Sequence, residues 1–157
     1  MIRPLVTLIT ELKKPCLPVE KNENIKEIIQ DLKDTLTKVG GLGITANQIG
    51  INKKISYIRI PKTIDQKTKK IEYTELVFIN AKIIEKSNPI KVTNEGCLSF
   101  RGVEVTTQRY IFITLQFENE KKEIQTGIFS DLEGFAVQHE TDHQNGITIF
   151  DRKWRAR

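Results

Sequence analysis

The chemically active residue types of this chain gather in QHETDHQNG, residues 138–146, which contains both of its histidines. His139 and His143 are spaced i and i+4, and on an α-helix these positions share one face, so both imidazoles could hold one metal ion. Glu140 lies about 100° around such a helix from His139, within reach of a metal-bound water without being a ligand. The HExxH pattern alone also occurs by chance. The alternative is a polar helix with two hydrogen-bonded histidines.

A catalytic metal site of this kind needs a third protein ligand. The chain has no other histidine, and Asp151 is the only acidic residue after His143. A cysteine is therefore the best candidate. Cys97 follows Gly96 in NEGCLSF, where a residue without Cβ lets the backbone approach a metal or substrate closely. A buried cysteine is more often a small core residue, but beside HExxH the balance favours a ligand.

A third segment, GGLGITANQIG, surrounds Gln48 with small residues. Gly41 and Gly43 are suited to a loop whose backbone contacts a ligand, and a glutamine amide can donate a hydrogen bond to a developing oxyanion. The rival interpretation is a phosphate-binding loop. It is disfavoured because no Lys-Ser/Thr pair follows and because the glycines come after a predicted helix instead of opening one.

The elements that must position these motifs can be predicted from hydrophobic periodicity. The segment 25–39 is expected to be an amphipathic surface helix that stops at Gly40–Gly41. From residue 55 the pattern predicts short strands, with PKTIDQKTKKIEY between the first two as an exposed hairpin loop. These strands are ISYIRI, ELVFIN, KIIEK, VEVTT, YIFITLQF and EIQTGIF.

A last helix is expected to carry QHETDHQ. Ser130 and Glu133 form a capping-box pattern that starts this helix near Asp131, and Asn145–Gly146 supplies its stop. The order of helix, strands and helix lacks the βαβ alternation of parallel sheets, which indicates the α+β class. We expect antiparallel strands packed around a C-terminal metal-binding helix, with one N-terminal amphipathic helix.

Composition bounds the function classes. With 38% hydrophobic and 29% charged residues, the 157-residue chain is typical of one soluble globular domain. The net charge of +5 is spread along the chain, so we expect a solvated surface and no specific nucleic-acid partner. The basic tail DRKWRAR either contacts ribosomal RNA or keeps the end soluble. Two cysteines make no disulfide framework, and MIRPLVTLIT is too short to span a bilayer. A cytoplasmic protein without a membrane partner is expected.

Together, and in this order, GLGITANQ at 41–48, EGCLS at 95–99 and QHETDH at 138–143 resemble the three motifs of peptide deformylases. That family's pattern is G-x-G-x-A-A-x-Q, E-G-C-L-S and H-E-x-x-H. The resemblance implies a single peptide deformylase-like catalytic domain over residues 1–157. Its implied activity is the metal-dependent hydrolysis of the formyl group from N-formylmethionyl peptides, with release of formate.

The resemblance also implies a role for each matching residue. Cys97, His139 and His143 would be the metal ligands, and Glu140 the general acid/base that takes a proton from water and passes it to the leaving amine. Gln48 and the backbone N–H of Leu98 would donate hydrogen bonds to the oxyanion. The methionine side chain would lie in a pocket made by Leu42, Gly43, Gly96, Leu132, Phe135 and Ala136.

The same resemblance favours one divalent metal ion, Fe(II) in the cell, although two imidazoles and a thiolate also suit Zn, Ni or Co in a purified sample. It further implies that Glu95 and Arg109 pair and hold the segment that carries the cysteine.

The chain departs from the family pattern at several positions. Thr45 replaces the usual first alanine, Gln144 replaces a common leucine, and Arg101 stands where proline is common. Arg101 would add a cation at the mouth of the site and alter the preference for residues after methionine. Only fourteen residues follow His143, so we expect a short, phage-like form without the long C-terminal helix. It would be a monomer in the bacterial cytosol or in a phage-infected host, and would contact the ribosome transiently, not through such a helix.

Three alternatives remain at this point. The site could act on another N-acyl or amide substrate. It could instead be a closed structural metal site completed by Cys16. The chain could also be a degraded paralogue that only binds peptides, although its presumed catalytic positions are intact.

Overall fold

The amphipathic segment after residue 25 forms α2 (Lys26–Val39), as expected. This computed structural model describes residues 1–156. Ile29, Leu32 and Leu36 of α2 are buried and belong to a core cluster that also contains residues of the first strands. The helix ends at Gly40, whose φ of +80° lies in the left-handed region that glycine adopts without a Cβ clash.

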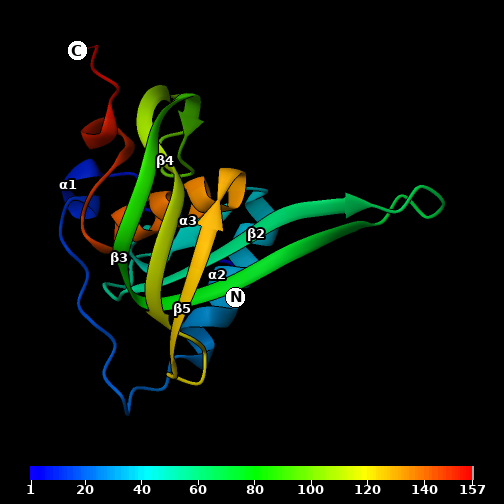
Figure 1. Ribbon diagram of the computed structural model, residues 1–157. Helices are drawn as coiled ribbons and strands as arrows, with labels where there is room; N and C mark the ends of the chain where they lie inside the picture. The colour runs from blue at the N-terminus through cyan, green and yellow to red at the C-terminus, as the bar shows by residue number, and fades with distance from the viewer. Residues whose placement is uncertain (157) are drawn as a thin grey trace.

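Five strands make one antiparallel sheet in which every strand pairs with its neighbour in the chain (Figure 1). The expected α+β class is therefore confirmed. Several strands predicted as separate are continuous: ELVFIN and KIIEK both belong to the third strand, and VEVTT and YIFITLQF to the fourth. The strands are β1 (Gly43–Thr45), β2 (Ile55–Ile64), β3 (Ile71–Gly96), β4 (Glu104–Glu118) and β5 (Ile124–Ser130).

The predicted loop PKTIDQKTKKIEY is shorter than expected. β2 continues to Ile64 and β3 begins at Ile71, so only residues 65–70 lie between the paired strands. In Figure 1 this β2–β3 hairpin extends beyond the rest of the molecule. Strands pair through their backbones and do not need apolar side chains, so strands could not be predicted from the polar sequence of this hairpin.

The long strand β3 is bent where it approaches the cysteine motif. Its pairing with β4 shifts register at three places, the last of them between Val92 and Glu95. Such irregularities bend a strand and re-aim the residues that follow. Cys97 comes directly after the end of β3, so the bend helps to direct the EGCLS segment.

The last helix, α3 (Asp131–Gln144), carries both histidines and lies among the strands in Figure 1. It begins at Asp131, and its C-cap is Asn145, as predicted. The predicted capping box is wrong, because the side chain of Ser130 makes no capping hydrogen bond. Ser130 is instead the last residue of β5, paired with Phe112, so its backbone still follows the sheet.

Three short helical segments were not predicted. They are α1 (Ile9–Leu12), η1 (Ala46–Ile49) and η2 (Ile149–Arg152). The segment expected to be a glycine-rich loop is therefore largely regular, since Gly43–Thr45 is strand β1 and the residues after it form η1. Within residues 1–156, no helix is long and apolar enough to cross a membrane.

Candidate active site

Cys97, His139 and His143 come together, each with one ligand atom within 4.8 Å of the others. His143 Nε2 is 3.2 Å from His139 Nε2 and 3.4 Å from Cys97 Sγ. With metal–nitrogen bonds of about 2.0–2.1 Å and a metal–sulfur bond of about 2.3 Å, a tetrahedral ion separates its ligand atoms by about 3.3–3.6 Å. The three side chains therefore fit a single divalent metal ion.

The environment of His143 also suits a metal ligand. Burial lowers the pKa of His143 well below its usual value. The imidazole is therefore held neutral, which is the form that binds metals.

Cys16 does not join this group. Its thiol donates a hydrogen bond to the backbone carbonyl oxygen of His143, at 3.6 Å, behind the ligand side chains. In the part of the chain that the structure describes, the only clustered candidate ligands are Cys97, His139 and His143. The closed site with two cysteines and two histidines therefore lacks its fourth ligand.

Glu95 and Arg109 pair, as the sequence predicted. Arg109 Nε donates to Glu95 Oε2 at 3.0 Å, while Glu95 Oε1 lies 2.8 Å from His139 Nδ1. Burial alone would raise the pKa of Glu95, but the hydrogen bonds from His139 and Arg109 outweigh it and hold the pKa well below its usual range. An ionised carboxylate on Nδ1 orients the imidazole and leaves Nε2 for a metal.

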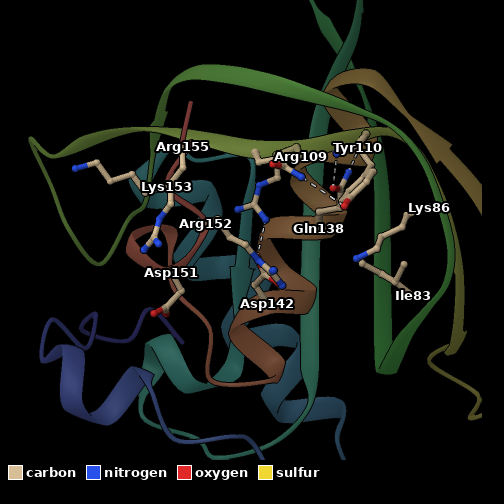
Figure 2. A pocket seen from close by; sticks show the side chains of 11 residues that line it. Ile83, Lys86, Arg109, Tyr110, Gln138, Asp142, Asp151, Arg152, Lys153 and Arg155 are labelled. Carbon is tan, nitrogen blue, oxygen red and sulfur yellow. Dashed lines mark hydrogen bonds and ion pairs between the residues drawn. The ribbon is translucent and has the colours of Figure 1, made fainter. Parts of the chain in front are cut away.

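Asp142 is buried. Its Oδ2 accepts a hydrogen bond from Arg109 Nη1 at 2.6 Å, and Arg152 donates to both of its carboxylate oxygens, at 2.8 and 3.0 Å. Figure 2 shows these residues at the wall of a cavity whose lining does not include the three candidate ligands. Its volume is about 400 Å³. Asp142 thus connects α3 with β4 and η2, and these partners could not be predicted from the sequence.

Glu140 is buried beside the ligand group, and this burial raises the pKa of its carboxyl group. Oε1 accepts a hydrogen bond from Thr45 Oγ1 at 3.0 Å, while Oε2 lies 3.9 Å from His139 Nε2. Gly43 leaves the space that Oε2 occupies, because a Cβ at that position would lie 2.7 Å from this oxygen.

The amide of Gln48 has a fixed orientation. Its Oε1 accepts the backbone N–H of Thr45 at 2.9 Å, and this directs Nε2 towards Ser99 Oγ at 3.2 Å and Cys97 Sγ at 3.7 Å. Thr45 and Gln48 form a capping box at the start of η1. The sequence TANQ matches the S/T-x-x-E/Q signature of a capping box, whereas the capping box was predicted at Ser130 and Glu133. Ser99, which accepts a hydrogen bond from Gln48, was also not predicted as a residue of the site.

A cavity of about 470 Å³ opens beside Cys97, His139 and Glu140. Arg101 lies on its wall, where the sequence placed a cation, and so does the side chain of Leu98. Gln48 does not line it. The six predicted pocket residues all line it, and they are Leu42, Gly43, Gly96, Leu132, Phe135 and Ala136. The bent end of β3 adds Val92, Thr93 and Asn94, which the sequence did not indicate.

Comparison with known proteins agrees with this geometry. The model of the polypeptide deformylase family matches residues 3–156. The peptide deformylase of Aquifex aeolicus is 37% identical over 164 residues, which cover 100% of this chain and 92% of that protein. Peptide deformylase 2 of Clostridium perfringens is 36% identical over 141 residues, covering 90% of this chain and 85% of the relative.

Solved structures show the same fold. A peptide deformylase from Legionella pneumophila superposes with a TM-score of 0.83 at 29% identity, covering 98% of this chain and 87% of that one. The peptide deformylase from Thermotoga maritima gives a TM-score of 0.83 at 25% identity, with 99% of both chains covered. The chain belongs to the polypeptide deformylase family.

Proposed function

We propose that this chain is a peptide deformylase, which hydrolyses the N-formyl group from the N-terminal formylmethionine of nascent polypeptides and releases formate. One observation carries this proposal. Three metal-ligating atoms lie within 4.8 Å of one another, and two of the three residues, Cys97 and His139, line a single cavity together with Glu140. A cavity of this kind can take an N-acyl group between a Lewis acid and a base.

Cys97, His139 and His143 would hold one divalent metal ion. Two imidazoles and a thiolate suit several metals, and we propose Fe(II) in the cell, with Zn, Ni or Co able to replace it in a purified sample. When bound, such an ion polarises a carbonyl group and lowers the pKa of a water molecule towards neutrality.

Glu140 is the proposed general acid/base. Its Oε2 reaches over Gly43 towards the ligand group, where it can take a proton from the attacking water and later deliver it to the leaving amine. The Nε2 group of Gln48, directed towards Cys97, and the backbone N–H of Leu98 would donate hydrogen bonds to the oxygen of the formyl group as its charge develops.

The methionine side chain would lie in the cavity beside these groups. Leu42, Leu132, Phe135 and Ala136 supply apolar surface there, while Gly43 and Gly96 leave room for the substrate backbone. Arg101, at the same cavity, would contact residues that follow methionine and would favour acidic ones over basic ones.

For the molecule as a whole, we propose one catalytic domain over residues 1–157 that acts as a cytoplasmic monomer. It would contact the ribosome transiently and would have no specific nucleic-acid partner. Both cysteines are free and buried, which agrees with a reducing compartment.

A pair of matched peptides tests the proposed function. Formyl-Met-Ala-Ser and acetyl-Met-Ala-Ser differ by one methyl group on the acyl carbon. With metal-loaded protein, formate release from the first should exceed acetate release from the second by orders of magnitude. Equal turnover of both peptides would sink the deformylase proposal and leave a general N-acyl hydrolase.

A further inference from the structure

A buried chain of polar side chains leads from the end of α3 to Glu140. Gln144 Nε2 lies 2.9 Å from Ser56 Oγ, which lies 2.8 Å from Thr45 Oγ1, which in turn lies 3.0 Å from Glu140 Oε1. Gln144, Ser56 and Thr45 are all 0% exposed. Ser56 and Thr45 are cross-strand partners on β2 and β1. Glu140 and Gln144 are i and i+4 on α3, so both face this pair.

The direction of donation at the far end of the chain is fixed by the backbone. Gln144 Oε1 accepts the N–H of Ala81 at 3.0 Å, and its Nε2 donates to the carbonyl oxygen of Phe78 at 3.1 Å. A backbone N–H can only donate and a carbonyl oxygen can only accept. The amide of Gln144 therefore cannot be turned over, and it presents a donor to Ser56.

Each hydroxyl has one proton to donate, so the donor at Gln144 determines the direction of the hydrogen bond from Ser56 and then of the one from Thr45. Ser56 accepts a hydrogen bond from Gln144 and donates one to Thr45 Oγ1 at 2.8 Å. The other possible acceptor for the Ser56 hydroxyl, the Glu140 carbonyl oxygen, is farther away, at 3.5 Å. Thr45 accepts from Ser56, so its own proton is available to Glu140, whose Oε1 at 3.0 Å is a closer acceptor than its carbonyl oxygen at 3.2 Å. A hydrogen bond to an ionised carboxylate is stronger than one between neutral groups.

The two oxygens of Glu140 consequently differ. Oε1 is held by the hydroxyl of Thr45 on the buried side. Oε2 lies above Gly43 and 3.9 Å from His139 Nε2. Two of the residues involved, Thr45 and Gln144, stand where the family pattern has alanine and commonly leucine, so this chain has a polar connection that the family pattern does not provide.

We propose that Gln144, Ser56 and Thr45 form a one-way hydrogen-bond chain that positions Glu140, with Oε1 as the anchored oxygen and Oε2 as the oxygen that transfers the proton. The inference rests on the proposed role of Glu140 as general acid/base. Thr45, Ser56 and Gln144 are positioning residues because none of their side chains lines the substrate cavity.

The kinetic test compares Thr45→Val with Thr45→Ser in metal-loaded enzyme acting on formyl-Met-Ala-Ser. Valine preserves the shape of threonine without its hydroxyl, and serine retains the hydroxyl. We expect Thr45→Val to lower kcat by about tenfold or more, the scale of one hydrogen bond to a charged group, at unchanged KM and metal content. Thr45→Ser should restore kcat to near the wild-type value.

Thr35→Val is the matched control. Thr35 is equally buried in α2, and its hydroxyl accepts one hydrogen bond, from the backbone N–H of Arg3 at 2.9 Å. This variant also loses one buried hydrogen bond but should keep the wild-type kcat. A wild-type kcat in Thr45→Val, or an equal loss in Thr35→Val, overturns the proposal.

A crystal structure of metal-loaded Thr45→Val supplies a readout that does not depend on activity. We expect the Glu140 carboxylate to rotate away from its orientation in the wild-type protein or to occupy two orientations. An unchanged, single orientation overturns the positioning role even if deformylation is established. If wild-type protein shows no deformylation while the carboxylate rotates, the proposed function fails and the hydrogen-bond chain stands. Gln144→Leu, which breaks the far end of the chain, replaces Thr45→Val if that variant does not fold.

Discussion

Gly43 leaves the space that the Glu140 side chain occupies, so the site does not tolerate a larger residue at this position. A Cβ there would lie 2.7 Å from Glu140 Oε2 and 2.8 Å from its Cγ, closer than unbonded atoms approach. Glu140 would have to move, because it is also packed against Thr45 from the other side.

Gly43→Ala should therefore lower kcat by about tenfold or more, since a misplaced general base loses much of its contribution. The metal content should be retained because no ligand is displaced. Turnover of a formyl-Met peptide and metal analysis on the same sample check this. Full kcat in the variant would mean that Oε2 is not the proton-transferring oxygen.

The two cysteines are expected to differ in reactivity. Burial raises the pKa of Cys16 to about 11, so roughly one molecule in a thousand carries the reactive thiolate at pH 8. Cys97 lines the cavity. After chelation of the metal, iodoacetamide should label Cys97 and leave Cys16 unmodified until the pH approaches 11. Mass spectrometry reads out both sites, and metal-dependent protection of Cys16 would contradict the ligand set.

At the scale of elements, the sequence predicted the two long helices, α2 and α3, and did not predict the three short helical segments. The spacing of apolar residues located α2, and Asn145–Gly146 marked the end of α3. Strand boundaries were less predictable, because β3 continues through register shifts and through polar residues of the hairpin arm. Capping was misassigned: Thr45 and Gln48 form a capping box, and Ser130 does not.

Arg109 joins three elements at the site, and its loss should be costly. It is 2% exposed and pairs with Glu95 at the end of β3 and with Asp142 on α3. Arg109→Ala leaves both carboxylates buried without this partner, which costs about 3–5 kcal/mol. We expect a lower denaturation midpoint together with a lower metal content, because Glu95 orients His139.

Arg152→Ala is the comparison for this prediction. Arg152 binds the same Asp142, but its side chain is 42% exposed. Its removal should cost about 0–1 kcal/mol, as exposed ion pairs do, and should leave the metal content unchanged. Equal losses of stability and metal content in Arg109→Ala and Arg152→Ala would contradict the prediction that the buried position of Arg109 makes it the more important partner of Asp142.

For the whole molecule, the candidate site was more predictable than the fold around it. The scarcity of histidines directed attention to the cysteines, and the resemblance to the family motifs indicated the three candidate ligands that the structure brings together. The part of the cavity wall formed by Val92, Thr93 and Asn94 could not be predicted. It depends on where β3 bends against β4, and that register is set by contacts between segments far apart in the sequence.

A metal ion that binds only the folded chain should stabilise the whole molecule. The gain is about 4 kcal/mol when the free metal exceeds its dissociation constant a thousandfold. Chelation should therefore lower the Tm of the wild-type protein, and added Ni(II) or Zn(II) should restore it. In Cys97→Ser the effect of chelation should be much smaller. The same Tm shift in both proteins would place the metal elsewhere.

The central claim is that Cys97, His139 and His143 hold the metal while Glu140 transfers protons. Its most direct test is the metal content of anaerobically purified Glu140→Gln, with formate release from formyl-Met-Ala-Ser measured on the same sample. The account predicts one metal ion per chain, as in the wild type, and a loss of turnover of about a hundredfold to ten-thousandfold. Loss of the metal, or turnover close to wild type, would contradict it.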